Sequence, residues 1–308
     1  MQSTLPVRVV YVAGYGRSGT TLLDVALGQH PQVIGSGEIA ELTGHVWREN
    51  EYCACGQPVH DCDFWSPVLR RWSEGQPSSL MPEYEDCQKK IESLIGLSKL
   101  SSGFGQGKQF AFYARNTTRL FEAILSQSGK STIVDSSKKP GRAMALALIP
   151  EIDLRVIHVV RDGRGVAWSL AKPYKRDVKS GLQREIKPKP VSRTALRWTM
   201  VNLGAEHLSR KLGPEKVMRL RYEDFVSDPA DAMQRIGAFA GLDFGGIGEK
   251  LQRGEPVRPG HQIAGNRLRM SASISLSKDE QWRSMMPPAQ QAVFRWLGGS
   301  MLRRYGYL

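Results

Sequence analysis

The glycine-rich segment Gly14–Thr21, with the sequence GYGRSGTT, restricts the fold of this chain more than any other feature. Residues 7–12 before it are β-branched and apolar, as in a buried strand, and residues 22–27 after it begin a helical pattern. The glycines therefore lie on a strand-to-helix turn. Such a turn aims backbone N–H groups and the positive end of a helix dipole at an anion, so the segment predicts a phosphate-binding loop.

Thr20 stands where a Walker loop carries its lysine. In a Walker loop that lysine reaches the β- and γ-phosphates, and the hydroxyl residue after it holds Mg²⁺. The cation of the present loop is Arg17, three positions before Thr20. We therefore expect a 5′-phosphorylated donor without a triphosphate, bound without a metal ion.

Strand-like and helix-like segments alternate along the rest of the chain. Further strands are expected at 32–35, 131–135, 155–160 and 217–222, and helices at 115–128, 141–149, 193–211 and 229–240. This order predicts a P-loop-like, three-layer α/β fold, with a central parallel sheet flanked by helices. Ligands of such sheets bind beyond the carboxyl ends of the strands. The polar residues expected at that edge are Arg17, Glu38, Ser137, Lys138, Arg161 and Tyr222.

The charge of the chain suits an anionic ligand. Among 308 residues, 43 Lys and Arg face 30 Asp and Glu, which gives a net charge of +13. The excess is concentrated in residues 172–193, a stretch with eight basic and two acidic residues. We interpret this stretch as a loop that closes over donor and acceptor, and a solvated surface loop is its alternative.

The position of the first strand bears on localisation. This strand begins by residue 7, which leaves no room for a secretory signal before it. The later sequence has no run of about 18 apolar residues, the length needed to span a membrane. We expect a cytoplasmic protein of a single domain, residues 1–308, with no stable membrane anchor.

Three of the four cysteines lie close together in the sequence, at Cys53, Cys55 and Cys62, with His60 between them. Zinc binding is one interpretation, but the second CxxC or CxxH pair of a strong zinc signature is missing. A packed, reduced turn is the favoured interpretation. The sequence leaves open whether the cysteines bind metal or only pack.

Arg161 and Ser169 form a second candidate phosphate site, because one ends a buried strand and the other lies about two turns into the next helix. Two phosphate sites without a Walker lysine describe a nucleotide with groups at both 3′ and 5′. Here the chain resembles the 3′-phosphoadenosine 5′-phosphosulfate-dependent sulfotransferases, in the bacterial, carbohydrate and tyrosyl-protein branches. The matching segments are residues 16–23, 159–164 through Ser169, 30–31, 37–38, 221–225 and 303–307.

The resemblance implies a role for each matching residue. Glu38 corresponds to the catalytic base of these branches, with Glu41 as its nearest competitor. Arg17 and Lys138 correspond to cations near the leaving oxygen and the sulfuryl group, although Lys139 could replace Lys138. The remaining residues implied in donor binding are Ser18, Gly19, Thr20, Thr21, Arg161, Ser169, Tyr222, Arg267 and Arg269. The last two belong to residues 265–269, which resemble a bacterial counterpart of the C-terminal glycine-rich loop.

The acceptor implied by the resemblance is a hydroxyl. Glu38 disfavours the histidine-based phenol and steroid branch, so a carbohydrate, glycolipid or other secondary metabolite comes first and a peptidyl tyrosine second. The nucleotide core would comprise about residues 7–42, 130–170 and 215–308, and the acceptor lobe about 43–115 and 172–200. His158, Trp198 and Trp282 are interpreted as packing residues.

Two other classes of function compete. A nucleotide kinase with a degenerate loop would use residues 133–135 as a short Walker B strand, but the missing lysine counts against it. A basic nucleic-acid-binding protein would use residues 172–193, but this leaves both phosphate motifs unexplained and no recognised motif accompanies the charge. We therefore expect no nucleic-acid partner.

Overall fold

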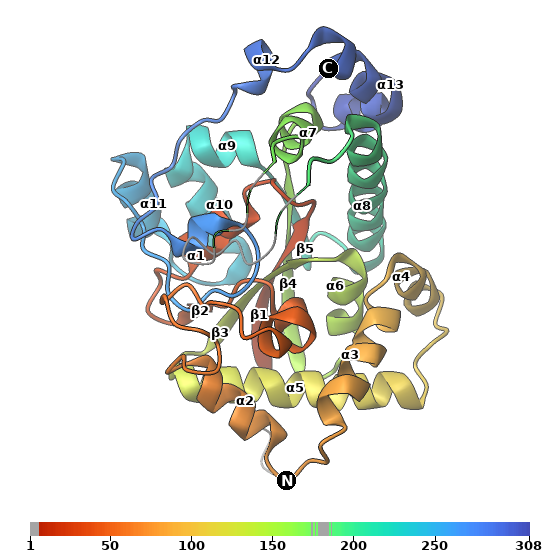
Figure 1. Cartoon of the computed structure of the whole chain (residues 1–308), viewed down its shortest axis with the longest axis vertical. Coiled ribbons are helices and arrows are strands. Elements are labelled where there is room, and N and C mark those ends of the chain that lie inside the picture. The colour runs from red at the N-terminus through yellow and green to blue at the C-terminus, as the bar shows by residue number, and fades with distance from the viewer. Residues whose placement is uncertain (1–5, 174, 176, 178–184, 186) are drawn as a thin grey trace.

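The structure is a computed structural model that describes residues 6–173, 175, 177, 185 and 187–308. Its centre is a parallel sheet with the strand order β2-β3-β1-β4-β5 (Figure 1). The strands are β1 (Val7–Gly14), β2 (Val33–Gly35), β3 (Thr132–Lys138), β4 (Ile152–Val160) and β5 (Val217–Arg221). The α/β fold with a parallel central sheet is therefore confirmed.

Apolar clusters cover both faces of the sheet. Alternate residues of each strand point to opposite faces and so contribute to different clusters. Val9 and Tyr11 of β1 join one core cluster, whereas Val10 and Val12 join the other. The first cluster includes residues of α5 (Lys108–Ser128) and α6 (Pro140–Ala147). Helices contributing to the second are α1 (Thr20–Leu27), α9 (Tyr222–Ser227), α10 (Pro229–Ala240) and α11 (Gly245–Gln252).

A third apolar cluster ties the C-terminal helices to the core. It joins α7 (Gly163–Leu170), α8 (Val191–Leu212), α12 (Trp282–Met285) and α13 (Pro288–Arg304). Trp198 lies edge-on to Phe294, with ring centroids 5.5 Å apart, and Trp282 is also buried in this cluster. Both tryptophans are packing residues, as expected.

His158 is a buried residue of β4 whose Nε2 lies 2.9 Å from Asn202 Oδ1. Burial lowers the pKa of His158 to about 4. The imidazole is therefore neutral near neutral pH and hydrogen-bonded inside the fold, which agrees with the interpretation as a core residue.

Residues 39–101 form a helical region beside the sheet, and its helices pack against α5 and α6 (Figure 1). They are η1 (Ile39–Glu41), the π-helical η2 (Leu42–Val46), α2 (Trp65–Ser73), α3 (Leu80–Ile91) and α4 (Leu94–Ser101). Later in the chain, η3 (Arg267–Met270) is a short 3₁₀ helix. None of the described helices has the length and apolar character needed to cross a membrane.

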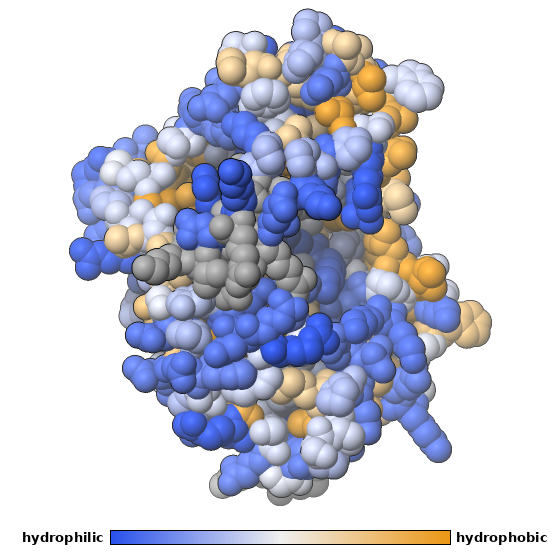
Figure 2. Space-filling view, viewed as in Figure 1, coloured by the Kyte–Doolittle hydropathy of each residue, from blue (hydrophilic) through white to orange (hydrophobic). Residues whose placement is uncertain are grey.

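Part of the predicted basic loop, residues 172–193, lies outside the described residues, because 174, 176, 178–184 and 186 are not described. At its ends, Lys172 approaches the ring of Trp168 at 5.3 Å and Lys189 donates its backbone N–H to Leu170. Figure 2 shows mainly hydrophilic side chains across the middle of this face, and apolar ones on the side where α8 lies. The exposed apolar residues of α8 are Leu196, Met200 and Leu203.

Candidate active site

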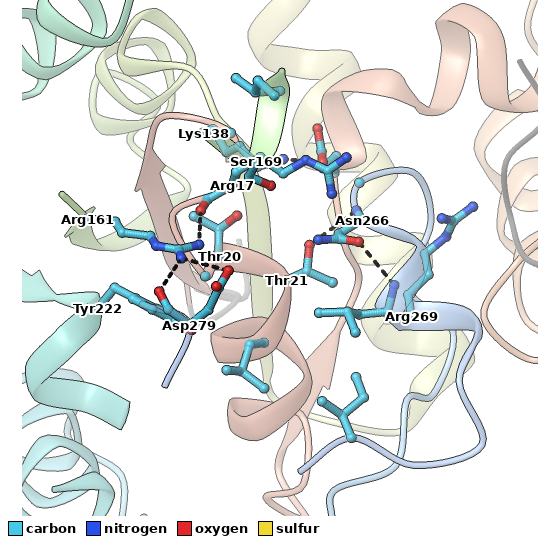
Figure 3. Close-up of a pocket in the computed structure, with 18 of the residues that line it drawn as sticks. Arg17, Thr20, Thr21, Lys138, Arg161, Ser169, Tyr222, Asn266, Arg269 and Asp279 are labelled. Carbon is cyan, nitrogen blue, oxygen red and sulfur yellow. Dashed lines mark hydrogen bonds and ion pairs between the residues drawn. The ribbon is translucent and has the colours of Figure 1, made fainter. Parts of the chain in front are cut away.

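A cavity of about 740 Å³ opens where the strands β1, β3 and β4 end. It is lined by backbone and side chains from several loops that follow these strands, as well as by the C-terminal segment 264–281 (Figure 3). The predicted site residues that line it are Arg17, Gly19, Thr20, Thr21, Glu38, Lys138, Arg161, Ser169, Tyr222 and Arg269. The tertiary structure thus brings most of the predicted site together.

The glycine-rich loop reaches this cavity through an unusual backbone. Arg17 has φ 68° and Gly19 has φ 88°, and α1 begins directly afterwards at Thr20. A Cβ atom on Gly19 would lie 2.4 Å from Cδ2 of Tyr222. Glycine is required at position 19 for two reasons, because both the left-handed backbone and the close ring exclude a side chain.

Glu38 and Lys138 meet at the carboxyl ends of the neighbouring strands β2 and β3. Lys138 Nζ donates to Glu38 Oε1, and both side chains are largely buried. Glu38 is held by its backbone N–H, which donates to Ile263 O at 3.0 Å. Lys138 has φ 70°, a left-handed conformation that is rare outside glycine. The carboxylate and the ammonium therefore face the cavity as a pair.

The side chain of Lys139 makes different contacts from that of Lys138. Its Nζ lies 2.9 Å from Glu41 Oε1 and 3.7 Å from Glu92 Oε2. Between the two adjacent lysines, Lys138 lines the cavity and contacts Glu38, whereas Lys139 pairs with carboxylates beside it. Glu41 lines the cavity too, but its carboxylate is engaged by Lys139 and by His45 at 3.4 Å.

His45 joins two carboxylates on the wall of the cavity. Its Nε2 lies 3.4 Å from Glu41 and its Nδ1 lies 2.9 Å from Glu51. The hydrogen bonds to Glu41 and Glu51 raise the pKa of His45 to about 9, and the hydrogen bond from His45 lowers the pKa of Glu41 to about 2. This wall is therefore charged and polar. Sequence reasoning missed His45 and Glu51, because neither follows a predicted strand.

Arg161 occupies the opposite side of the cavity. Its Nη1 donates to Arg17 O at 3.0 Å, and its Nη2 donates to the carbonyl and the carboxylate of Asp279, each at 3.0 Å (Figure 3). Its guanidinium also stacks 4.6 Å from the ring centroid of Tyr222. Arg161 thus links the glycine-rich loop to the C-terminal segment, and Asp279, which no motif marked, is part of this arrangement.

The C-terminal segment crosses over Glu38 and the glycine-rich loop. Gly37 and Ile263 form an isolated parallel bridge, and Asn266 N donates to Thr21 Oγ1 at 3.4 Å. Gly265 has φ 77°, and a Cβ there would lie 2.7 Å from Glu38 Oε1. This glycine allows the segment to pass directly over the Glu38 carboxylate.

Arg269 lines the cavity and is buried, with Nη2 donating to Tyr52 O at 3.2 Å. Two other predicted residues lie elsewhere. Arg267 is exposed and is not among the lining residues, and Ser18, within the glycine-rich loop, is buried. Arg267 therefore does not join the cavity, and the Ser18 side chain does not line it.

The Asp135 carboxylate, proposed for a Walker B strand, is not among the residues that line the cavity. It is fully buried, and its Oδ2 accepts from Arg142 Nε at 2.8 Å. Arg142 also donates to Glu92, so the three residues form a buried charged group behind β3. The kinase alternative assigned Asp135 to a Walker B strand. The Asp135 carboxylate is paired in the core and is not among the lining residues, which counts against that alternative.

Comparison with known proteins agrees with this geometry. The model of the family described as "Sulfotransferase family" matches residues 9–245, which is most of the chain. No curated protein sequence matches significantly. The chain belongs to the sulfotransferase family, and it is a sulfotransferase.

Two solved sulfotransferase domains have a similar fold. The sulfotransferase domain of the Synechococcus PCC 7002 olefin synthase matches with a TM-score of 0.52 at 19% identity, covering 98% of this chain and 96% of that one. The sulfotransferase domain from the curacin biosynthetic pathway matches with a TM-score of 0.50 at 18% identity, covering 99% of both chains. These similarities support the P-loop-like fold.

Proposed function

We propose that this sulfotransferase moves a sulfuryl group from 3′-phosphoadenosine 5′-phosphosulfate to an acceptor hydroxyl. The observation that carries the proposal is the placement of the Glu38–Lys138 pair and the glycine-rich loop on the same cavity as Arg161 and Ser169. A loop without a Walker lysine suits a single 5′-phosphate, and a second cation with a hydroxyl suits a 3′-phosphate.

The residues present fit this donor. The loop turns into α1 at Gly19, where N–H groups and the helix dipole favour an anion. The hydrogen bonds of Arg161 use only part of the N–H groups that a guanidinium carries, so the side chain keeps donors for a phosphate. In this proposal Gly19, Thr20 and Thr21 hold the 5′-phosphate, and Arg161 with Ser169 holds the 3′-phosphate.

Glu38 is the proposed base. When bound, the donor supplies the sulfuryl group, with 3′,5′-phosphoadenosine as the leaving group. Glu38 takes the proton of the acceptor O–H as the acceptor oxygen bonds to sulfur. Arg17 and Lys138 stabilise the negative charge on the oxygen that keeps the electron pair of the broken S–O bond. Lys138 also holds the Glu38 carboxylate in place before the acceptor binds.

The wall formed by Glu41, His45 and Glu51 favours a polar acceptor. These three side chains form a hydrogen-bonded network that lines the cavity, so they present polar atoms to a ligand with several hydroxyls. An apolar phenol or steroid would displace water from this wall without making hydrogen bonds to it, which costs free energy. We therefore place carbohydrates and other polyhydroxylated metabolites first, with residues 43–115 as the acceptor lobe. A tyrosine in an acidic peptide comes second.

Calorimetric titration tests the donor. In buffer without Mg²⁺, 3′,5′-phosphoadenosine should bind much more tightly than AMP or ATP, because AMP leaves the 3′-phosphate contacts unmade. Arg161→Ala should remove most of that difference. Equal affinities for AMP and 3′,5′-phosphoadenosine would contradict the donor proposal.

Matched glutamine variants test the base. Glu38→Gln should lower turnover by about 10²-fold or more and leave the affinity for 3′,5′-phosphoadenosine nearly unchanged. Glu41→Gln is the control, since its carboxylate is held by Lys139 and His45. An inactive Glu41→Gln enzyme beside an active Glu38→Gln enzyme would identify Glu41 as the base.

A further inference from the structure

Three neighbouring cysteines and one histidine about 200 residues later form a cluster outside the active-site cavity. Cys53, Cys55 and Cys62 meet His261, and their ligand atoms all lie within 4.8 Å of one another. Cys62 Sγ lies 3.4 Å from His261 Nδ1, Cys53 Sγ lies 3.7 Å from the same nitrogen, and Cys55 Sγ lies 3.6 Å from Cys62 Sγ. All three cysteines are free thiols.

These separations match the edges of a tetrahedral zinc site. Zinc bonds of about 2.3 Å to sulfur and about 2.0–2.1 Å to nitrogen place neighbouring ligand atoms about 3.5–3.8 Å apart in a tetrahedron. The separations of 3.4, 3.6 and 3.7 Å lie close to these edges, and the other pairs of ligand atoms lie within 4.8 Å. A disulfide requires sulfur atoms about 2.05 Å apart, much closer than Cys55 and Cys62.

The backbone around the cysteines forms a tight turn. Tyr52 bridges to Pro58, and Cys53 N donates to Gln57 O at 2.9 Å. Gly56 turns the chain with φ 89° and donates its N–H to Cys53 O at 3.0 Å. This turn brings both Cys53 and Cys55 to the same cluster.

The fourth ligand is fixed by its surroundings. The ring of Phe64 stacks on His261 with centroids 5.0 Å apart, and Trp65 Nε1 donates to His261 O at 2.6 Å. His60, the histidine between the cysteines in sequence, turns away from the cluster. Its Nε2 lies 2.8 Å from Trp47 O and its ring packs on Trp47.

We propose that Cys53, Cys55, Cys62 and His261 bind one Zn²⁺ ion in a closed structural site. Three thiolates and one imidazole complete the four-coordinate set of structural zinc, with no position left for water or substrate. Binding releases the three thiol protons to solvent, because the metal takes thiolates. The earlier expectation that this chain needs no metal then applies to sulfuryl transfer only.

The zinc site would hold the C-terminal segment over the catalytic pair. Ala54 N donates to Gln262 O at 3.0 Å, one residue from His261, and the bridge between Gly37 and Ile263 follows directly. Glu38 N donates to Ile263 O in the same segment. The metal is thus a positioning element, because it fastens the segment that carries Gly265 and contacts the backbone of Glu38.

Metal analysis of the purified full-length chain is the first test. Protein from zinc-supplemented growth should carry about one zinc per chain after desalting. Cys62→Ser and Cys53→Ser should each lose most of the bound zinc, whereas Cys87→Ser should retain it. Cys87 is the matched control because it lies on α3 and outside the cluster. Wild-type protein without zinc, or equal loss in Cys87→Ser, would overturn the proposal.

Cobalt supplies a readout that needs no variant. Growth with Co²⁺ in place of zinc should give the wild-type chain the visible absorption of tetrahedral cobalt and a thiolate-to-cobalt charge-transfer band. Octahedral cobalt spectra, or a Cys55–Cys62 disulfide found by mass spectrometry of the freshly purified chain, would refute the site. Chelation of zinc should also lower the melting temperature, since a ligand of the native state stabilises it.

Discussion

Lys138 and Glu38 form an ion pair across the carboxyl ends of two neighbouring strands, β2 and β3, although they lie 100 residues apart in sequence. Their side chains are 16% and 15% exposed, so the pair is only partly screened by solvent. Lys138 has a left-handed backbone, and its side chain pairs with Glu38. The side chain of the next residue, Lys139, pairs with Glu41 instead. Backbone strain of this kind gathers at functional sites, and Arg17 and Ala264, also with positive φ, line the same cavity.

The two adjacent lysines should differ sharply in their effect on catalysis. We expect Lys138→Met to lower turnover by about 10²-fold, because it removes a cation from the site where charge develops. Lys139→Met should change turnover little, since Lys139 pairs with Glu41 and Glu92. Steady-state kinetics of both variants check this. Similar losses in the two would show that charge near the cavity matters and position does not.

Glycine substitutions in the phosphate loop should have opposite outcomes. Gly19→Ala should destabilise the fold by about 1–2 kcal/mol for the left-handed backbone alone, and its Cβ would press on the Tyr222 ring at 2.4 Å. Gly16→Ala is the control, because its φ is not positive and no atom lies within 4 Å of its added Cβ. Urea unfolding measures both variants. Equal stability of the two would contradict the close approach of Tyr222.

The buried Arg142 should be essential for folding. Arg142→Met would leave the Asp135 and Glu92 carboxylates without their cation inside the core, which costs about 3–5 kcal/mol for a broken buried pair. Arg155→Met is the matched control, because its partner Asp153 is about one third exposed and such pairs contribute about 0–1 kcal/mol. Denaturant unfolding of the two variants should therefore diverge, and a small effect of Arg142→Met would show that the carboxylates become neutral or solvated.

His45 should stabilise the fold in a pH-dependent manner. Its pKa is raised from 6.5 to about 9 in the folded chain, mainly by the hydrogen bonds to Glu41 and Glu51. The folded state therefore binds the proton more tightly than the unfolded state, and this stabilisation is complete below pH 6.5 and lost as pH rises through about 9. The difference in unfolding free energy between wild type and His45→Asn should shrink over that interval.

The buried His158 provides a contrast of opposite sign. Burial lowers its pKa to about 4, so the unfolded state binds the proton more readily and stability falls as pH drops from 6.5 toward 4.

For His45, the contradicting outcome is a difference in unfolding free energy between wild type and His45→Asn that stays constant from pH 6.5 to 9. That result would contradict the pairing with Glu41 and Glu51.

Local pattern was sufficient for the scaffold of the site. A glycine-rich turn between an apolar strand and a helix requires left-handed backbone and a short turn, and these requirements depend on a few neighbouring residues. The helix expected at 229–240 lies at those bounds, whereas the one expected from 115 begins at Lys108. In a parallel sheet the carboxyl ends of the strands meet at one edge. The sequence could therefore place Arg17, Lys138 and Arg161 at one cavity, because each follows a strand.

By itself, the sequence determined the phosphate-binding loop, the parallel sheet and the sulfotransferase resemblance, because these depend on spacing within short segments. Only the tertiary structure decided which side chains meet across long distances. It paired Arg161 with Asp279, separated Lys138 from Lys139, and brought His261 rather than His60 to the cysteines. The physical reason is that such partners are selected by the packing of whole layers. Packing depends on residues that are 100 to 208 positions apart here and share no local pattern.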